Sequence, residues 1–425
     1  MGSRGLPRIL FVAHNSGGGA GTAAYRLFQS LVRAGAEVRF LVWEEPKNGI
    51  QLWYGPLAKH PEGSPWKKLS KASARVRSTF RSIVNWSGRL WEDWLWLDRS
   101  AAFEIVSIRL GWAHLSQHPW FTWAEVIHLH WTAGFLAPRQ EFGSKHWVIS
   151  LHDCYPFTAV CHFPNGCMSF LTGCHQCPQL RGSRNLKLSG IRFRQKARGY
   201  QTLSRGTVHA PSQWIADLCA KSPLLGHLGR RVLPNIFPTS IFRPHEAGPC
   251  RRLLGLPDRG PIALFVAGPV ANNRKGMALF LGLTARSEFQ HWTFLVVGTG
   301  ELSSREPSVR FLGPITDLRL MAAAFSAADV FVTAALEDNY PSTVAESQLC
   351  GTPVVGLAVG GQKEMVDQGI AGWLSGDISV NGLVEGLKWY ESSQPDRNRI
   401  AEAAHKRWNE SRVVGQWLEF YRSLS

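Results

Sequence analysis

The sequence begins with a pattern that predicts a parallel α/β sheet. The stretch "RILFVAHNSGGGAGTAAYRLFQSLVRAGAEVRFLVW" gives an apolar run, a glycine loop, an amphipathic stretch and a second apolar run. This order is typical of two parallel strands joined by a helix. The apolar runs "AEVIHLHW", "HWVISLHD", "GTVHAPS" and "RRVLPN" follow in the same half of the chain. Because such runs suit strands that are buried on both faces, we predict one doubly wound parallel sheet here.

The second half of the chain repeats this organisation. The proline- and glycine-rich stretch 233–261 interrupts the pattern, and "IALFVAGPV", "WTFLVVGTGE", "VRFLGPI", "ADVFVTAA" and "TPVVGLAV" come after it. A chain of 425 residues is long enough for two cores. We therefore predict two Rossmann-like lobes, 1–237 and 238–400, and a C-terminal helix, 401–425, that crosses back to the first lobe. Ligands are expected in the cleft at the carboxyl ends of both sets of strands.

The charge of the chain favours an anionic partner. Its formal net charge is +16 at pH 7. Nucleic acid, a phosphorylated substrate and an acidic membrane surface all fit this charge. The sequence holds no run of about 18 apolar residues, and its start lacks the apolar segment of a secretory signal. We therefore expect a cytoplasmic protein whose thiols stay reduced.

A basic, tryptophan-rich insertion at 51–123 interrupts the first lobe. Residues 67–81 carry six basic side chains and no acidic one, and apolar residues recur there at helical spacing. This predicts an amphipathic helix, which either covers a lobe with a solvated face or docks on an anionic membrane. The tryptophans that follow favour the membrane because indole suits the headgroup region. They are Trp86, Trp91, Trp94 and Trp96.

The glycine loop "NSGGGAGTAAYRL" allows three interpretations. Gly19, Gly21 and Ala24 have the spacing of a dinucleotide-binding loop, and Glu44 or Glu45 follows where an acid would bind the ribose. A nicotinamide enzyme is therefore an alternative function. Glycines also serve any loop whose backbone approaches a ligand, and they serve a tight turn that binds nothing.

The stretch "LEDNYPSTVAESQLCGTPVVG" in the second lobe points to sugar phosphates. Asp338 and Glu346 are separated by seven residues, and a helix is predicted to begin near Ser342, just after Pro341. Backbone N–H groups at a helix start attract an anion, and a carboxylate accepts hydrogen bonds from hydroxyl groups. Together these groups suit a ligand that carries both a phosphate and a sugar.

At these residues the sequence resembles the family 4 glycosyltransferases, which are retaining enzymes with the GT-B fold. "DNYPSTVAESQLCGTPVV", "VISLHD", "VLPNIFPTSIFRP", "NNRKG", "LVVGTGE", "FSAADVFV" and "GGQKEMV" carry the resemblance along nearly the whole chain. It implies a hexosyltransferase that uses a UDP- or GDP-sugar. The block "HDxxPFT…C…C…TGCxxCPQ" is similar to that of bacterial enzymes for colanic-acid-type exopolysaccharide or lipopolysaccharide, which implies a glycan or polyprenyl-diphosphate-linked acceptor. A nucleic-acid partner is supported by the charge alone, because the sequence contains no recognisable nucleic-acid-binding module, and we expect none.

The resemblance also implies roles for residues of the second lobe. Glu346 would grip the nucleotide ribose, and Lys275 would contact the donor diphosphate. Asp338 stands where the family has a glutamate near the donor sugar, and its neighbour Glu337 is the alternative. The arginine usual earlier in the lobe is replaced by Pro269, so Arg274 would supply its charge. The backbone groups expected at the donor belong to Gly298, Gly300, Ser342 and Thr343.

In the first lobe, the resemblance places His152 at the cleft and Gly17, Gly18 and Gly19 in the loop that approaches donor and acceptor. His128 and His130 alternate on one strand and so share a face, where they either take part in the site or pack in the core. Glu364 is expected at a helix start rather than on a ligand. The implied mechanism is front-face transfer, in which the leaving phosphate helps to deprotonate the acceptor. It requires no catalytic metal or other cofactor.

Five of the eight cysteines fall within residues 152–180, and we predict a cysteine-rich insertion of the first lobe at 154–180. Cys161, Cys167, Cys174 and Cys177 end in a C-x2-C pair, and four thiolates at this spacing would close a structural zinc site. Buried reduced thiols and disulfides are the alternatives. Cys154 lies off this spacing and is expected to pack in the core.

Overall fold

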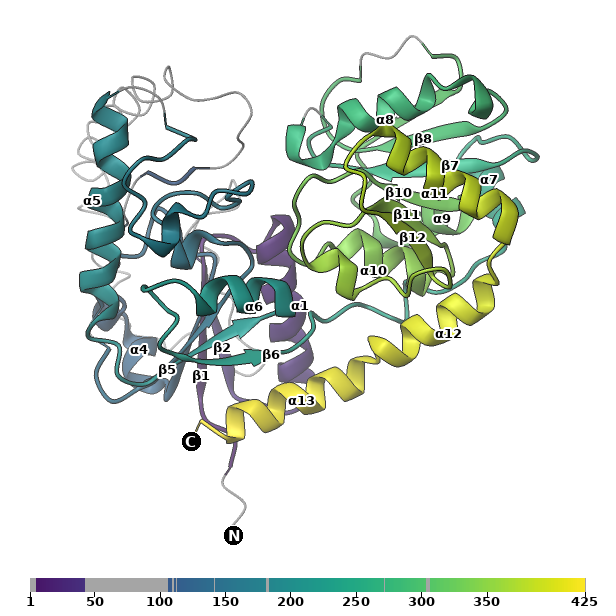
Figure 1. The fold of residues 1–425 in the computed structure, drawn as a ribbon. Helices are drawn as coiled ribbons and strands as arrows, with labels where there is room; N and C mark the ends of the chain where they lie inside the picture. Colours follow the sequence, from purple (N-terminus) through teal and green to yellow (C-terminus); the bar gives the residue numbers. More distant parts are fainter. Residues whose placement is uncertain are drawn as a thin grey trace, which may run out of the picture.

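Two α/β lobes lie side by side in the computed structural model, which describes residues 5–42, 106–108, 111, 113–140, 142–180, 183–270, 272–302 and 306–424 (Figure 1). The predicted basic helix at 67–81, the tryptophans around it, and Glu44 and Glu45 lie outside these residues. Each lobe contains a six-stranded sheet in which all the named strands pair in parallel. The prediction of two doubly wound parallel sheets is therefore confirmed.

The sheet of lobe one has the strand order β2-β1-β3-β4-β5-β6. Every residue of β1 and β3 is buried, as the continuous apolar runs predicted. The elements are β1 Ile9–Ala13, α1 Gly18–Arg33, β2 Val38–Val42, η1 Leu115–Gln117, α4 Pro119–Trp123, β3 Val126–His130, β4 His146–Ser150, η2 Tyr155–Phe157, η3 Ser169–Leu171, α5 Ser183–Tyr200, β5 Gly206–Ala210, α6 Gln213–Ala220 and β6 Gly229–Val232.

The sheet of lobe two has the order β12-β11-β10-β7-β8-β9. The apolar runs predicted five of its strands, but β12 was missed because "GWLS" is too short to give a periodic signal. The elements are α7 Ala247–Leu253, β7 Ile262–Val266, η4 Asn273–Lys275, α8 Met277–Thr284, η5 Ser287–Phe289, β8 Thr293–Val297, β9 Val309–Gly313, α9 Leu318–Ala327, β10 Val330–Thr333, α10 Ser342–Leu349, β11 Val354–Leu357, η6 Gly360–Glu364, β12 Gly372–Ser375 and α11 Val380–Ser393.

The last two helices connect the lobes. Helix α12, Arg397–Arg407, packs on lobe two, and α13, Glu410–Arg422, runs back across lobe one (Figure 1). The chain turns between them at Asn409, whose side chain caps α13. On α13, Trp417 and Tyr421 are almost fully buried in the same cluster as β1 and β2. Residues 401–407 thus continue α12 in lobe two, and only α13 crosses.

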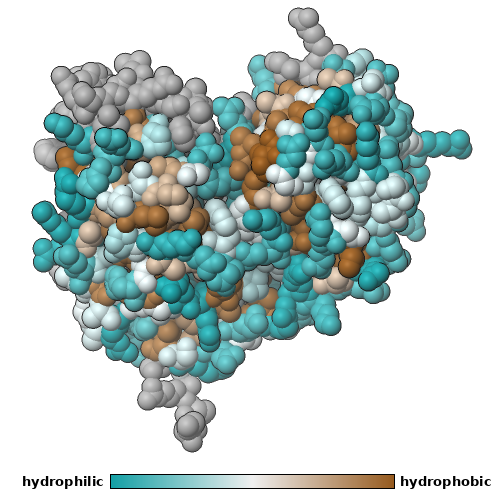
Figure 2. Space-filling model, viewed as in Figure 1, coloured by the Kyte–Doolittle hydropathy of each residue, from teal (hydrophilic) through white to brown (hydrophobic). Residues whose placement is uncertain are grey.

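On the face shown in Figure 2, hydrophilic residues surround several apolar patches on both lobes, and a notch separates the lobes at the top of the view. No helix in the described part of the chain combines the length and the apolar character needed to cross a membrane.

Candidate functional site

Two cations and one carboxylate meet in lobe two after strands β7 and β10. The Nζ atom of Lys275 lies 2.6 Å from Oδ2 of Asp338, and Nη1 of Arg274 lies 3.2 Å from the same oxygen. Arg274 also donates to the backbone oxygen of Glu337. Burial alone would raise the pKa of Asp338, but the two cations outweigh it and lower that pKa. Asp338 is therefore ionised and shared by the two predicted phosphate-binding side chains.

Gly276 makes this cluster possible because it brings two loops into contact. Its φ is +74°, and a Cβ atom there would lie 1.8 Å from the backbone oxygen of Ala334. Only glycine tolerates both conditions. The close approach sets Lys275 and Arg274, which directly precede Gly276, beside the loop that carries Asp338.

Glu337 points away from the cluster and reaches lobe one. Its Oε2 atom accepts a hydrogen bond of 2.6 Å from the backbone N–H of Asn165, in the cysteine-rich insertion. Burial raises the pKa of Glu337 to about 7, although the Asn165 N–H and the Arg274 charge act in the opposite direction. Of the two carboxylates considered for the donor sugar, Asp338 faces the cations and Glu337 faces the other lobe.

Glu346 also contacts lobe one, through an ion pair. Both terminal nitrogens of Arg26, on α1, donate to its Oε1 atom over 3.0 and 3.1 Å. Burial raises the pKa of Glu346, and the Arg26 charge and hydrogen bonds partly oppose the shift. Arg26 was missed in the sequence because nothing distinguishes it from the other basic residues of an amphipathic helix. Ser342 and Thr343 form the first turn of α10, one turn before Glu346.

The glycine loop of lobe one has an open part and a tightly packed part. Gly17, Gly18 and Gly19 are exposed, and a Cβ atom on any of them would meet nothing within 4 Å. A Cβ atom on Gly21, in contrast, would lie 2.6 Å from the backbone oxygen of Asn15. Gly21 thus packs the loop, while residues 17–19 leave open space at the start of α1.

The predicted glycines of lobe two are explained by the backbone. A Cβ atom on Gly298 would lie 1.8 Å from the backbone oxygen of Ala267, so Gly298 lets the ends of β7 and β8 approach. Gly300 has a φ of +100°, which disfavours other residues.

The two histidines of β3 and the histidine that follows β4 lie next to one another. The Nε2 atom of His152 lies 3.0 Å from Nδ1 of His130, and burial lowers the pKa of His152 to about 4. His128 contacts the hydroxyl of Tyr421 on α13 and the hydroxyl of Ser150. His128 therefore lies in the core against α13, whereas His152 is half-buried and follows β4 at its carboxyl end.

Asn339 and Glu364 tie the two lobes together. The Asn339 amide accepts from the Ser212 hydroxyl over 2.7 Å and donates to the backbone oxygen of Leu151 over 2.8 Å. Glu364 accepts from the backbone N–H groups of Gln213 and Trp214, each over 2.7 Å. The sequence predicts Glu364 at a helix start. In the structure Glu364 ends η6, and its carboxylate binds the first N–H groups of α6 in the other lobe.

The four cysteines of the predicted metal site line one small cavity in the insertion. All eight cysteines of the chain are free thiols. Burial raises the pKa of Cys161, Cys174 and Cys177, so these thiols favour the protonated form when no metal is bound. In the described residues, no group of three or more His, Cys, Asp or Glu side chains is arranged to hold a metal ion.

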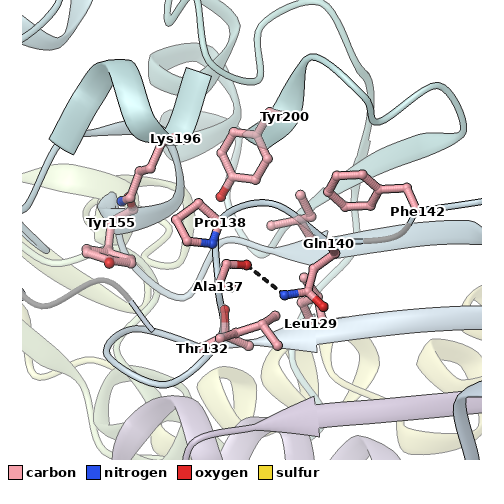
Figure 3. Close-up of a pocket in the computed structure, with 11 residues that line it drawn as sticks. Leu129, Thr132, Ala137, Pro138, Gln140, Phe142, Tyr155, Lys196 and Tyr200 are labelled. Atoms are coloured by element: carbon pink, nitrogen blue, oxygen red, sulfur yellow. Dashed lines mark hydrogen bonds between the residues drawn. The ribbon is translucent and has the colours of Figure 1, made fainter. Parts of the chain in front are cut away.

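A second cavity lies beneath the insertion in lobe one (Figure 3). Lys196 projects from α5 into it and donates to the backbone oxygens of Tyr155 and Thr158. Burial lowers the pKa of Lys196 to about 7. Because Tyr155 and Thr158 lie near the start of the insertion, Lys196 anchors this segment to the lobe.

Arg26→Leu is expected to destabilise the protein. The side chains of Arg26 and Glu346 are 13% and 8% exposed, and removal of one partner from a buried ion pair costs about 3–5 kcal/mol. Urea denaturation should show this loss. The matched control is Arg33→Leu. The side chains of Arg33 and Glu410 are 63% and 30% exposed, so the loss of their ion pair should cost about 1 kcal/mol or less. Equal effects of the two substitutions would contradict the analysis.

Glu337→Gln is expected to change how stability depends on pH. Burial raises the pKa of Glu337 in the folded protein to about 7, whereas the ordinary pKa of a glutamate is 4.5. Between these values the folded state binds more protons, so the contribution of Glu337 to stability falls as pH rises. The stability of the wild type relative to the variant should drop by up to roughly 3 kcal/mol between pH 4.5 and 8. A constant difference in urea denaturation across this range would refute the shift.

Comparison with known proteins agrees with this geometry. Residues 260–390 match the family model described as "Glycosyl transferases group 1". A D-inositol 3-phosphate glycosyltransferase of Acidothermus cellulolyticus is 33% identical over 165 residues, which make up 34% of this chain and only 36% of that protein. The putative colanic acid biosynthesis glycosyl transferase WcaC of Escherichia coli is 25% identical over 298 residues, which cover 65% of this chain and 68% of WcaC.

Solved structures share the fold over the whole length of the chain. Sucrose-phosphate synthase from Thermosynechococcus elongatus gives a TM-score of 0.63 at 17% identity and covers 98% of this chain and 99% of its own. Anabaena HepE, solved in complex with UDP-glucose, gives a TM-score of 0.56 at 15% identity. The match covers 98% of this chain and 100% of HepE. These likenesses show that the chain has the GT-B fold, and the family match shows that its second lobe is similar to the group 1 glycosyltransferases.

Proposed function

We propose that the protein transfers a sugar from a UDP- or GDP-sugar to a growing or lipid-linked surface glycan, with retention of the anomeric configuration. The observation that carries the proposal is the convergence of Lys275 and Arg274 on Asp338, in the segment that leads from β10 to α10 and its Glu346. Cations and a helix N-terminus bind phosphate groups, and a carboxylate binds sugar hydroxyls. HepE, which shares the fold, is solved with UDP-glucose, and this supports a nucleotide-sugar donor.

Cleavage of the donor builds negative charge on the leaving diphosphate. Lys275 and Arg274 stabilise that charge, and the dipole of α10 adds to their effect. Asp338 holds both cations in place before the donor binds. The leaving phosphate then accepts the proton of the acceptor hydroxyl on the same face of the sugar, which retains the configuration. No metal or other cofactor is proposed for this step.

Glu346 and His152 position the sugars of the donor. A carboxylate has about four acceptor positions, so Glu346 can bind ribose hydroxyls while Oε1 keeps its contact with Arg26. With a pKa of about 4, His152 is neutral at physiological pH. Its ring therefore forms hydrogen bonds but carries no charge.

The similarity to WcaC, a putative colanic acid biosynthesis glycosyl transferase, supports a surface-polysaccharide acceptor. The net charge of +16 supports a peripheral position on the anionic inner face of the membrane, where such acceptors are anchored. The nicotinamide alternative depended on the spacing of the glycine loop and on Glu44, whereas the family match covers the donor motifs of lobe two.

Lys275→Ala should abolish transfer. The experiment incubates the full chain with a panel of nucleotide sugars and glycan-lipid acceptors and measures released nucleoside diphosphate. Loss of one cation at the developing charge should lower kcat by about 100-fold or more. The control, Lys388→Ala, removes a lysine from a surface pair with Glu288 and should keep full activity. Full activity of Lys275→Ala, or binding of NAD instead of UDP or GDP by the wild type, would refute the proposal.

We also propose a structural zinc ion at Cys161, Cys167, Cys174 and Cys177. Their shared cavity and the terminal C-x2-C pair support it. Zinc binds thiolate sulfurs at about 2.3 Å, so the four side chains must converge further than they do in this structure and must lose their protons. The ion would hold the insertion in shape and take no part in the transfer.

Metal analysis of the purified protein should find about one zinc ion per chain. Cys174→Ser should lower the zinc content because it removes one of four ligands. Cys219→Ser is the matched control, since Cys219 is buried elsewhere in the same lobe and should leave the zinc content unchanged. A folded, active sample without zinc would eliminate the site.

A further inference from the structure

The tip of the cysteine-rich insertion, residues 163–166, touches the donor cluster of the other lobe. The guanidinium carbon of Arg274 lies 3.9 Å from the centre of the Phe163 ring. Two residues later, the Asn165 N–H donates to Glu337. The tip thus meets both a cation of the cluster and the carboxylate beside it.

The tip has the geometry of a defined turn. Asn165 and Gly166 have φ values of 48° and 77°, and the Cys167 N–H donates to the backbone oxygen of Pro164 over 3.0 Å. Two successive residues with positive φ, in the order Asn-Gly, are typical of a tight reversing turn. The buried side chain of Gln179 donates to the backbone oxygen of Phe163 over 2.7 Å, which fixes the segment that enters the turn.

The base of the insertion is equally well fixed. The Asp153 carboxylate accepts hydrogen bonds from the indole of Trp131 and from the backbone N–H of Tyr155, and it contacts His162 over 2.6 Å. His162 immediately precedes Phe163. A rigid base and a hydrogen-bonded tip allow the insertion to hold a partner side chain in one orientation.

We infer that Phe163 and Asn165 are positioning residues for the nucleotide-sugar site, because they fix the orientations of Arg274 and Glu337. This inference rests on the proposed function. The Phe163 ring attracts the guanidinium electrostatically and blocks its rotation away from Asp338. Asn165 draws Glu337 towards lobe one, and so keeps a second carboxylate away from the position where the donor phosphates gather.

The lobes do not depend on this contact to stay together. Asn339 with Ser212, Glu364 with α6, and Arg26 with Glu346 connect them at other points. Loss of the Phe163 ring should therefore disturb Arg274 and leave the lobe interface in place. Such a change should weaken the binding of the nucleotide and leave the binding of the acceptor unchanged.

Substitutions of Phe163 in the full chain test the inference. Phe163→Leu keeps an apolar side chain but removes the aromatic face, while Phe163→Tyr keeps that face. We expect Phe163→Leu to weaken the binding of UDP and GDP, measured by calorimetry, by roughly five- to thirtyfold. Phe163→Tyr should bind within about twofold of the wild type. In transfer assays, Phe163→Leu should raise the donor KM and leave the acceptor KM unchanged.

Met168→Ala is the matched control, because Met168 is an exposed apolar residue of the same insertion, two residues beyond its turn. It should bind nucleotide like the wild type, and all three variants should keep the wild-type thermal midpoint within a few degrees. Equal nucleotide affinity of Phe163→Leu, Phe163→Tyr and the wild type would overturn the positioning role while leaving the proposed function intact. If the wild type bound neither nucleotide, the proposed function would fail, and the inference with it.

Discussion

The ionised Asp338 between Lys275 and Arg274 is the interaction on which the site depends. Two neighbouring cations in η4 repel one another, and the shared carboxylate offsets that repulsion. Its low pKa keeps it charged at physiological pH. The cluster can therefore be preformed, with its side chains oriented before a diphosphate arrives. Preorganised charge of this kind stabilises a developing anion without reorganisation during the reaction.

The same short segment after β10 also joins the two lobes. Asp338 serves the cluster, while its neighbours Glu337 and Asn339 reach across to Asn165, Ser212 and the end of β4. Alternate side chains of one loop thus bind the cations and the opposite lobe. Donor binding and lobe contact are coupled in this arrangement, because a shift of the loop changes both. The fold supplies the geometry, since the carboxyl ends of parallel strands in both lobes face the interface.

The sequence predicted the parts of this structure that carry a local signal. The two sheets follow from continuous apolar runs, Asp338 and Glu346 from motif spacing, and Lys275 from the resemblance to a known family. Arg26, Phe163 and Asn165 could not be found in the same way, because their importance comes from partners 320, 111 and 172 positions away in the chain, a separation that no local pattern encodes. The division of the C-terminal segment at Asn409 was missed for a related reason. Helices α12 and α13 are both amphipathic, and only tertiary packing assigns one to each lobe.

Hydrogen–deuterium exchange of the full chain, with and without UDP or GDP, tests the central claim most directly because it locates the bound nucleotide. The account predicts slower exchange in residues 15–21, 163–167, 272–276 and 336–346, which come from both lobes. Protection confined to the hollow of lobe two lined by Arg243, His245 and Arg319, or no protection by either nucleotide, would contradict it.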